Sequence, residues 1–195
     1  MARLVFINGA PGTGKSTVAH ALSREDRLAV VVDVDQLKHS LGGWEQDPTA
    51  SGLHARRLAL ALADEQLRSG HDVYVGQYAA RTEFIEALED LARRRSASFH
   101  EFVLDVDADR LADRLTTRAD SPTRPEHEIN SRLLAASDAA ELISSLTAVR
   151  AARPGAIRID ASGTLEATVA SIRAELRRAN PPASDDPGAG STADS

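Results

Sequence analysis

The chain has 195 residues, no cysteine and a formal net charge of −6 at pH 7. The length suits one domain, and the lack of cysteine excludes disulfide frameworks, thiol catalysis and cysteine-ligated metal centres. The acidic balance argues against a nucleic-acid partner, and no apolar run is long enough for a signal-peptide core or a membrane span. We therefore expect a cytoplasmic protein, a monomer or homodimer, with neither nucleic acid nor membrane as partner.

Strands and helices are predicted to alternate along the chain. Apolar runs predict strands over residues 3–8, 28–35, 71–78, 97–107 and 156–160. Apolar residues at helical spacing predict helices over residues 15–25, 54–68, 81–95, 108–118, 126–150 and 164–178. The alternation predicts an α/β fold: a three-layer α/β/α sandwich around a parallel five-stranded sheet, which binds ligands at the carboxyl ends of its strands.

Composition changes near the end of the chain. Residues 181–195 contain no large apolar residue and are rich in Pro, Gly, Ser and Asp. Such a segment cannot bury enough apolar surface to fold, so we predict one domain over residues 1–180 and a disordered tail over 181–195.

The strongest motif follows the first predicted strand. Residues 9–16, "GAPGTGKS", match the phosphate-binding pattern GxxxxGK[ST], with a predicted strand before and a helix after. Glycines let backbone N–H groups converge on a phosphate, Lys15 reaches the β- and γ-phosphates, and the Ser16 hydroxyl ligates Mg²⁺. ATP or GTP with Mg²⁺ is the expected ligand. The residues predicted to bind it are Gly9, Ala10, Pro11, Gly12, Thr13, Gly14, Lys15 and Ser16.

A pair of carboxylates indicates transfer of the phosphate. The NKxD base-reading element of a Ras-type GTPase is absent, and the third predicted strand ends "VGQY" without a carboxylate. Asp33 and Asp35 end the second predicted strand, where residues two apart point the same way. One would steady a Mg²⁺-bound water while the other accepts the proton of an attacking hydroxyl. The alternative for Asp35 is a helix N-cap before "QLKHSL".

Arginines form the third constellation. Arg114 and Arg118 lie four apart on one predicted helical face, and Arg124 lies in the following loop, a predicted lid over residues 119–125. Arginine on a loop can close over a γ-phosphate, and a guanidinium plane can stack on a base. The alternative is a solvated arginine face paired with Asp113 and Asp120.

Together, the phosphate loop, the Asp-x-Asp pair and the arginine lid resemble the small P-loop kinases. This group includes shikimate and gluconate kinases, chloramphenicol phosphotransferase and the zeta-toxin kinases. The resemblance implies a nucleoside-kinase-like P-loop NTPase fold with strand order 2-3-1-4-5, ATP and Mg²⁺ as cofactors, and a loop at 161–163 beside the adenine. The roles it implies are Thr17 as a further nucleotide ligand, Asp33 as metal support, Asp35 as the base, Arg118 stacking on adenine and Arg124 closing on the γ-phosphate.

The acceptor is less well defined. The sequence "VGQYAARTEF" lacks the glycine-rich substrate loop of shikimate kinases, and gluconate kinases have a different lid. The candidate substrate residues are Asp35, Trp44, Gln77 and Arg81. We predict an ATP-dependent phosphotransferase that acts on a small-molecule hydroxyl acceptor of a sugar, nucleoside or antibiotic type. The alternatives are an ATP-binding regulatory or partner-binding protein without kinase activity and a polynucleotide 5′-hydroxyl kinase, the latter opposed by the acidic charge.

Overall fold

Five parallel strands form one sheet in the order β2-β3-β1-β4-β5, as predicted. The computed structural model describes residues 1–120 and 136–179, except for the side chains of residues 118–120 and 136. β1 lies in the centre and pairs with β3 on one side and β4 on the other, so that Val5 is opposite both Tyr74 and His100. The strands are β1 (Arg3–Asn8), β2 (Val30–Val32), β3 (Val73–Gly76), β4 (Ser98–Asp105) and β5 (Ile157–Asp160).

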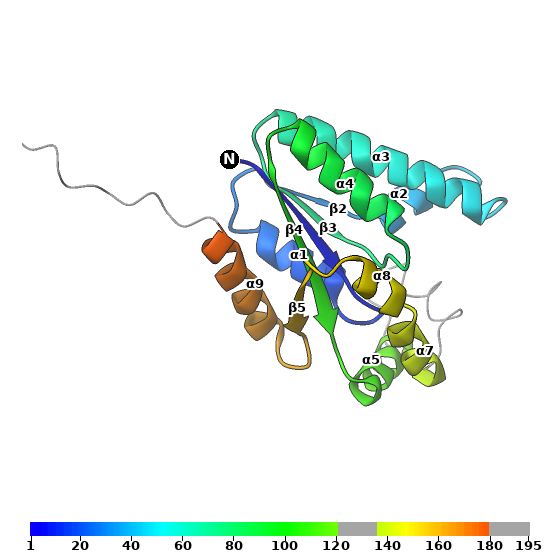
Figure 1. The fold of residues 1–195 in the computed structure, drawn as a ribbon. Helices are drawn as coiled ribbons and strands as arrows, with labels where there is room; N and C mark the ends of the chain where they lie inside the picture. The colour runs from blue at the N-terminus through cyan, green and yellow to red at the C-terminus, as the bar shows by residue number, and fades with distance from the viewer. Residues whose placement is uncertain (121–135, 180–195) are drawn as a thin grey trace, which may run out of the picture.

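Helices cover both faces of the sheet, which gives the predicted three layers. α3 and α4 lie side by side over one face, α1 and α9 lie over the other, and α5, α7 and α8 gather near the carboxyl ends of the strands (Figure 1). In the described ranges none of these helices is both long and apolar enough to cross a bilayer. The helices are α1 (Lys15–Ser23), α2 (Val34–His39), α3 (Pro48–Arg68), α4 (Glu83–Arg94), α5 (Ala108–Asp120), α7 (Ala139–Ser144), α8 (Thr147–Ala152) and α9 (Leu165–Ala179), with a 3₁₀ turn at Ala136–Asp138.

The central strand explains why both layers are stable. Consecutive side chains of a strand point to opposite faces. Leu4 and Phe6 therefore pack in the cluster under α3 and α4, whereas Val5 and Ile7 pack in the cluster under α1 and α9. All four are fully buried, and this is why β1 is a continuous apolar run.

The predicted second strand is too long. It was expected over residues 28–35, but β2 ends at Val32 and the chain enters α2 at Val34. The reason is an N-cap: Asp33 Oδ1 accepts hydrogen bonds from the backbone N–H groups of Asp35 (3.0 Å) and Gln36 (3.1 Å). Asp33 and Asp35 therefore do not share a strand face, and the cap is Asp33 rather than Asp35.

The predicted helix over residues 126–150 is also wrong in its described part. α7 ends at Ser144 and α8 begins at Thr147. The Ser145 hydroxyl at the break hydrogen-bonds the Leu142 carbonyl at 2.6 Å, a local bond by which serine competes with helix continuation. Residues 126–135 of this predicted helix and the predicted tail over 181–195 lie outside the described residues.

Candidate nucleotide and acceptor site

The loop between β1 and α1 has the backbone of an anion site. Gly12 and Gly14 both have φ of 93°, a region that L side chains rarely adopt. Gly14 is the N-cap of α1, and it has no side chain that could accept a hydrogen bond from the N–H groups of the first turn. The helix N-terminus also adds partial positive charge. An anionic phosphate fits this arrangement.

Two side chains fix the shape of the loop. Asn8, which is fully buried at the end of β1, accepts from the N–H groups of Gly9 (2.8 Å) and Ala79 (3.0 Å) and donates to the Ala79 carbonyl (3.0 Å). The Thr13 hydroxyl donates to the Ala10 carbonyl at 2.9 Å. Asn8 therefore ties the loop to the segment after β3. Sequence reasoning missed this residue, although a polar side chain ending an apolar strand was its signal.

Lys15 lies back over the loop. Its Nζ donates to the Ala10 carbonyl at 2.9 Å, which keeps the ammonium group beside the N–H groups of the loop. The backbone of Lys15 meets the end of β3 closely, since a Cβ on Gly76 would lie 2.9 Å from the Lys15 carbonyl oxygen. The start of α1 and the end of β3 are thus in direct contact, and the loop is positioned by the sheet.

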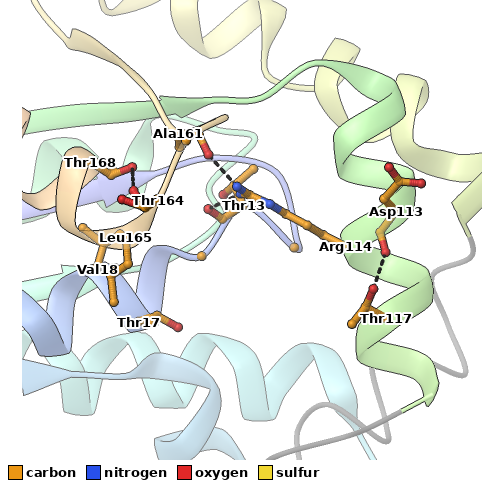
Figure 2. A pocket seen from close by; sticks show the side chains of 13 residues that line it. Thr13, Thr17, Val18, Asp113, Arg114, Thr117, Ala161, Thr164, Leu165 and Thr168 are labelled. Carbon is orange, nitrogen blue, oxygen red and sulfur yellow. Dashed lines mark hydrogen bonds between the residues drawn. The ribbon is translucent and has the colours of Figure 1, made fainter.

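A cavity of about 580 Å³ extends from this loop between α5 and the segment after β5. Figure 2 shows Arg114 reaching from α5 across its end: Nη2 donates to the Ala161 carbonyl at 2.7 Å, and Nη1 points to the Thr13 carbonyl at 3.4 Å. The volume is within the range of small-molecule sites. The lining residues are Gly12, Thr13, Gly14, Thr17, Val18, Asp113, Arg114, Thr117, Ala161, Gly163, Thr164, Leu165 and Thr168.

The arginines are placed differently from one another. Arg114 is part-buried, and its hydrogen bonds go to backbone carbonyls rather than to a solvated ion pair. Arg118 belongs to α5, but its side chain is outside the described part, and so are Arg124 and residues 121–125 of the predicted lid. The roles expected of Arg118 and Arg124 stay predictions. Among the described side chains, Arg114 is the arginine that lines the cavity.

Asp35 lies in the first turn of α2, close to Lys15. Burial raises the pKa of its carboxyl group, and the nearby Asp33 carboxylate raises it further. The charges of Lys15 and His39 and a hydrogen bond with the Gln77 side chain oppose this shift but do not cancel it. Two predicted site residues, Asp35 and Gln77, are thus brought together from two different elements. A carboxylate with a raised pKa is a better proton acceptor than an exposed one.

The candidate metal ligands are oxygen atoms, the donor type that Mg²⁺ prefers. They are the Ser16 hydroxyl at the start of α1 and the Asp33 carboxylate at the start of α2. Over residues 1–120 and 136–179 no group of three or more His, Asp or Glu side chains could hold a metal by itself. Proteins bind Mg²⁺ through one or two side chains together with substrate phosphates and water.

Trp44 and Arg81 lie at different places. The Trp44 ring packs on the end of α2, with its centroid 4.5 Å from the His39 ring and 5.1 Å from Lys38 Nζ. Arg81 lines a second cavity, also of about 580 Å³, between α3, α4 and the segment after β3. Arg81 lies four residues after Gln77 in the chain.

The chain belongs to the family whose model is described as an AAA domain (AAA_33), which matches residues 4–143. Uncharacterized proteins of Mycobacterium tuberculosis and Mycobacterium bovis are 30% identical over 145 residues, which are 68% of this chain and 29% of each relative. The chain thus spans less than a third of the length of these curated relatives.

Solved structures share the fold. A gluconokinase from Sinorhizobium meliloti superposes with a TM-score of 0.61 at 20% identity, covering 90% of this chain and 91% of the other. An APS kinase of Mycobacterium tuberculosis, solved in complex with AMPPNP and APS, superposes with a TM-score of 0.60 at 19% identity, covering 90% of this chain and 98% of the other. A tunicamycin resistance protein from Deinococcus radiodurans has a TM-score of 0.58 at 15% identity, covering 90% and 96%. The chain is a P-loop ATP-binding domain with the fold of small kinases.

Proposed function

We propose that the protein transfers the γ-phosphate of Mg-ATP to a hydroxyl group of a small molecule. The observation that carries this proposal is the placement of Asp35. The part-buried Asp35 carboxylate lies near Lys15 of the phosphate loop and near the Gln77 side chain, and burial raises the pKa of this carboxyl group. A protein that only holds nucleotide does not need a base beside the phosphate loop, whereas a hydroxyl kinase does.

Each residue has a distinct role in this proposal. The N–H groups of the loop and the Lys15 ammonium hold the phosphates, and Ser16 and Asp33 hold the metal. Mg-ATP, when bound, supplies the phosphoryl group and a cation that neutralises charge on its oxygens. Asp35 accepts the proton of the acceptor hydroxyl as that oxygen attacks, and Gln77 holds the carboxylate in place.

Arg114 and the residues at 161–168 are assigned to the nucleoside end. They line the cavity that continues from the phosphate loop, and Arg114 connects the two segments through Ala161 and Thr13. The loop at 161–163 is thus proposed to lie beside the adenine, with ATP as the donor.

ADP formation is the readout that tests the proposal. The protein is incubated with Mg-ATP and with a panel of sugars, sugar acids, nucleosides and hydroxylated antibiotics. We expect ADP to form only with some acceptors, each giving a new phosphate ester. ATP binding without acceptor-dependent turnover anywhere on the panel would instead favour a regulatory ATP-binding protein.

A further inference from the structure

The second cavity has an arrangement that the proposed transfer chemistry does not require. It lies between α3 and α4, which run side by side over one face of the sheet (Figure 1), and the segment after β3 closes one side. Its volume of about 580 Å³ suits a small molecule. The lining residues are Leu53, Arg56, Arg57, Leu60, Tyr78, Ala79, Ala80, Arg81, Glu83, Phe84 and Ala87.

The lining is cationic although the chain is acidic. Arg56, Arg57 and Arg81 face a single carboxylate, Glu83, so the lining has a formal charge of +2 in a chain of net charge −6. In the described part of the chain none of these three arginines forms an ion pair, while the N-terminal Arg3 has two carboxylate partners. Guanidinium groups around one cavity repel one another, and a bound anion would relieve that repulsion.

One wall of the cavity is apolar. Phe84 is nearly buried, and its ring packs edge-on against Phe6 with a centroid separation of 6.4 Å. The Arg56 guanidinium lies 6.0 Å from the Phe84 ring centroid, within reach of a cation–π contact that orients this arginine. Leu60 and Ala87 extend the apolar lining. A ligand for this cavity therefore has a compact apolar or ring-shaped body as well as a charged group.

The cavity is connected to Asp35 by the chain itself. The Gln77 side chain lies near Asp35, and the four residues that follow Gln77, 78–81, all line the cavity. The main chain there is fixed, because Ala79 exchanges two hydrogen bonds with the buried Asn8 side chain. A molecule that fills the cavity would thus contact the segment 78–81, which begins directly after Gln77.

We infer that this cavity binds the acceptor and selects hydroxyl compounds that carry an anionic oxygen-containing group, such as a carboxylate or a phosphate, on a compact ring or apolar body. The inference rests on the proposed phosphotransfer. Arg81 and Arg57 bind the anion, Arg56 is held over Phe84, and the acceptor hydroxyl is directed to Asp35. Guanidinium is the side chain best suited to binding carboxylate or phosphate through two hydrogen bonds.

Matched acceptor pairs test the inference on the full chain. Each pair differs only in the charged group: a sugar acid against the parent sugar, a sugar phosphate against the sugar, and a hydroxy acid against its amide. Turnover is followed as ADP formation, and binding is measured separately by calorimetry without ATP. We expect the anionic member of at least one pair to have a kcat/KM at least tenfold higher, and to bind where its neutral counterpart does not.

Variants assign the preference to the cavity. Arg81→Gln should raise the KM for the anionic acceptor about tenfold and leave the KM for ATP unchanged, and Arg81→Lys should restore part of the loss. Arg177→Gln removes the same charge from the exposed last turn of α9 and serves as the matched control. Thermal unfolding of each variant tests whether the fold is retained.

The possible failures are distinguishable. Equal turnover of neutral and anionic acceptors, with no effect of Arg81→Gln, would overturn the inference and leave the proposed kinase activity standing. Binding of anionic compounds that depends on Arg81, with no turnover of any acceptor, would support the anion site and overturn the kinase. Neither binding nor turnover would overturn both.

Discussion

Replacing Asp35 by Asn separates its proposed catalytic role from a structural one. The substitution keeps the size of the side chain and an oxygen that can accept the hydrogen bond from Gln77, but it removes the base. Removal of a general base typically lowers kcat by about 10²–10⁴-fold, which corresponds to about 3–5 kcal/mol of transition-state stabilisation. We therefore expect transfer to fall by this factor while the affinity for ATP stays within about twofold.

Asp35→Asn should raise the stability of the folded state although it lowers the transfer activity. Burial and the Asp33 carboxylate raise the pKa of Asp35 above the ordinary value of 3.8, so the folded chain binds more protons than the unfolded chain in the pH range just above that value. The ionised carboxylate then costs the folded state free energy, and the cost grows as pH rises through this range. At pH 7 the Asp35→Asn variant should melt at a higher temperature than the wild type. The difference should disappear below about pH 3.5, where Asp is protonated in both states.

Acceptor-dependent ADP formation and thermal unfolding at pH 3 and pH 7 measure both effects. The acid limb of the pH–rate profile should also disappear in the Asn variant, since Asp35 must be ionised to accept a proton. Unchanged transfer by Asp35→Asn would refute the assignment of Asp35 as the base. A lower melting temperature at pH 7 would refute the reasoning about its burial.

The remaining predictions concern the loop, the cap and the nucleoside end. Asp33→Ala should lose the α2 cap and with it about 1 kcal/mol of stability, which corresponds to a fall of about 2–4 °C in Tm. Asp33→Asn should keep the cap. Both variants should raise the Mg²⁺ concentration that activity requires. Gly76→Ala places a Cβ 2.9 Å from the Lys15 carbonyl oxygen. The variant should therefore lose about 1–3 kcal/mol of stability, measured by chemical denaturation, and bind ATP more weakly. Unchanged stability and unchanged ATP affinity would contradict the close contact. Arg114→Gln loses the bond to the Ala161 carbonyl and should raise the KM for ATP about tenfold with the acceptor KM unchanged; an effect on the acceptor alone would contradict its placement.

The sheet was predictable because its signals are local. Continuous apolar runs indicate strands that are covered on both faces. The phosphate-loop motif identifies the strand directly before it as the first strand of the fold. The order 2-3-1-4-5 came from the resemblance, and the structure confirms it. Asp107 directly precedes α5, and its carboxylate accepts a hydrogen bond from the Arg110 N–H at 2.8 Å, as an N-cap does.

The predicted end of the second strand was wrong because the apolar run and the helix cap overlap in the sequence. Valines continue through Val34, so hydrophobicity alone extends the strand, whereas the Asp33 carboxylate starts a helix. Gln36, three residues after Asp33, was a usable signal, because an acceptor followed three residues later by Glu or Gln is typical of a helix start.

The side-chain partners of the site depend on tertiary contacts that no local pattern encodes. Arg114 and Arg118 share a predicted helical face, and spacing alone does not say which of them reaches the Ala161 carbonyl. The second cavity brings Arg56 and Arg57 from α3 next to Arg81 from the segment after β3, which requires the packing of α3 on the sheet.

The most direct test follows both products of one reaction by ³¹P NMR. Wild-type protein is mixed with Mg-ATP and an acceptor selected from the matched pairs. Phosphotransfer predicts that ADP and a new phosphate monoester appear in equal amounts, that inorganic phosphate stays at background, and that Asp35→Asn slows the formation of both products about 10²–10⁴-fold. ADP accompanied by an equal amount of inorganic phosphate, with every acceptor and regardless of Asp35, would contradict it.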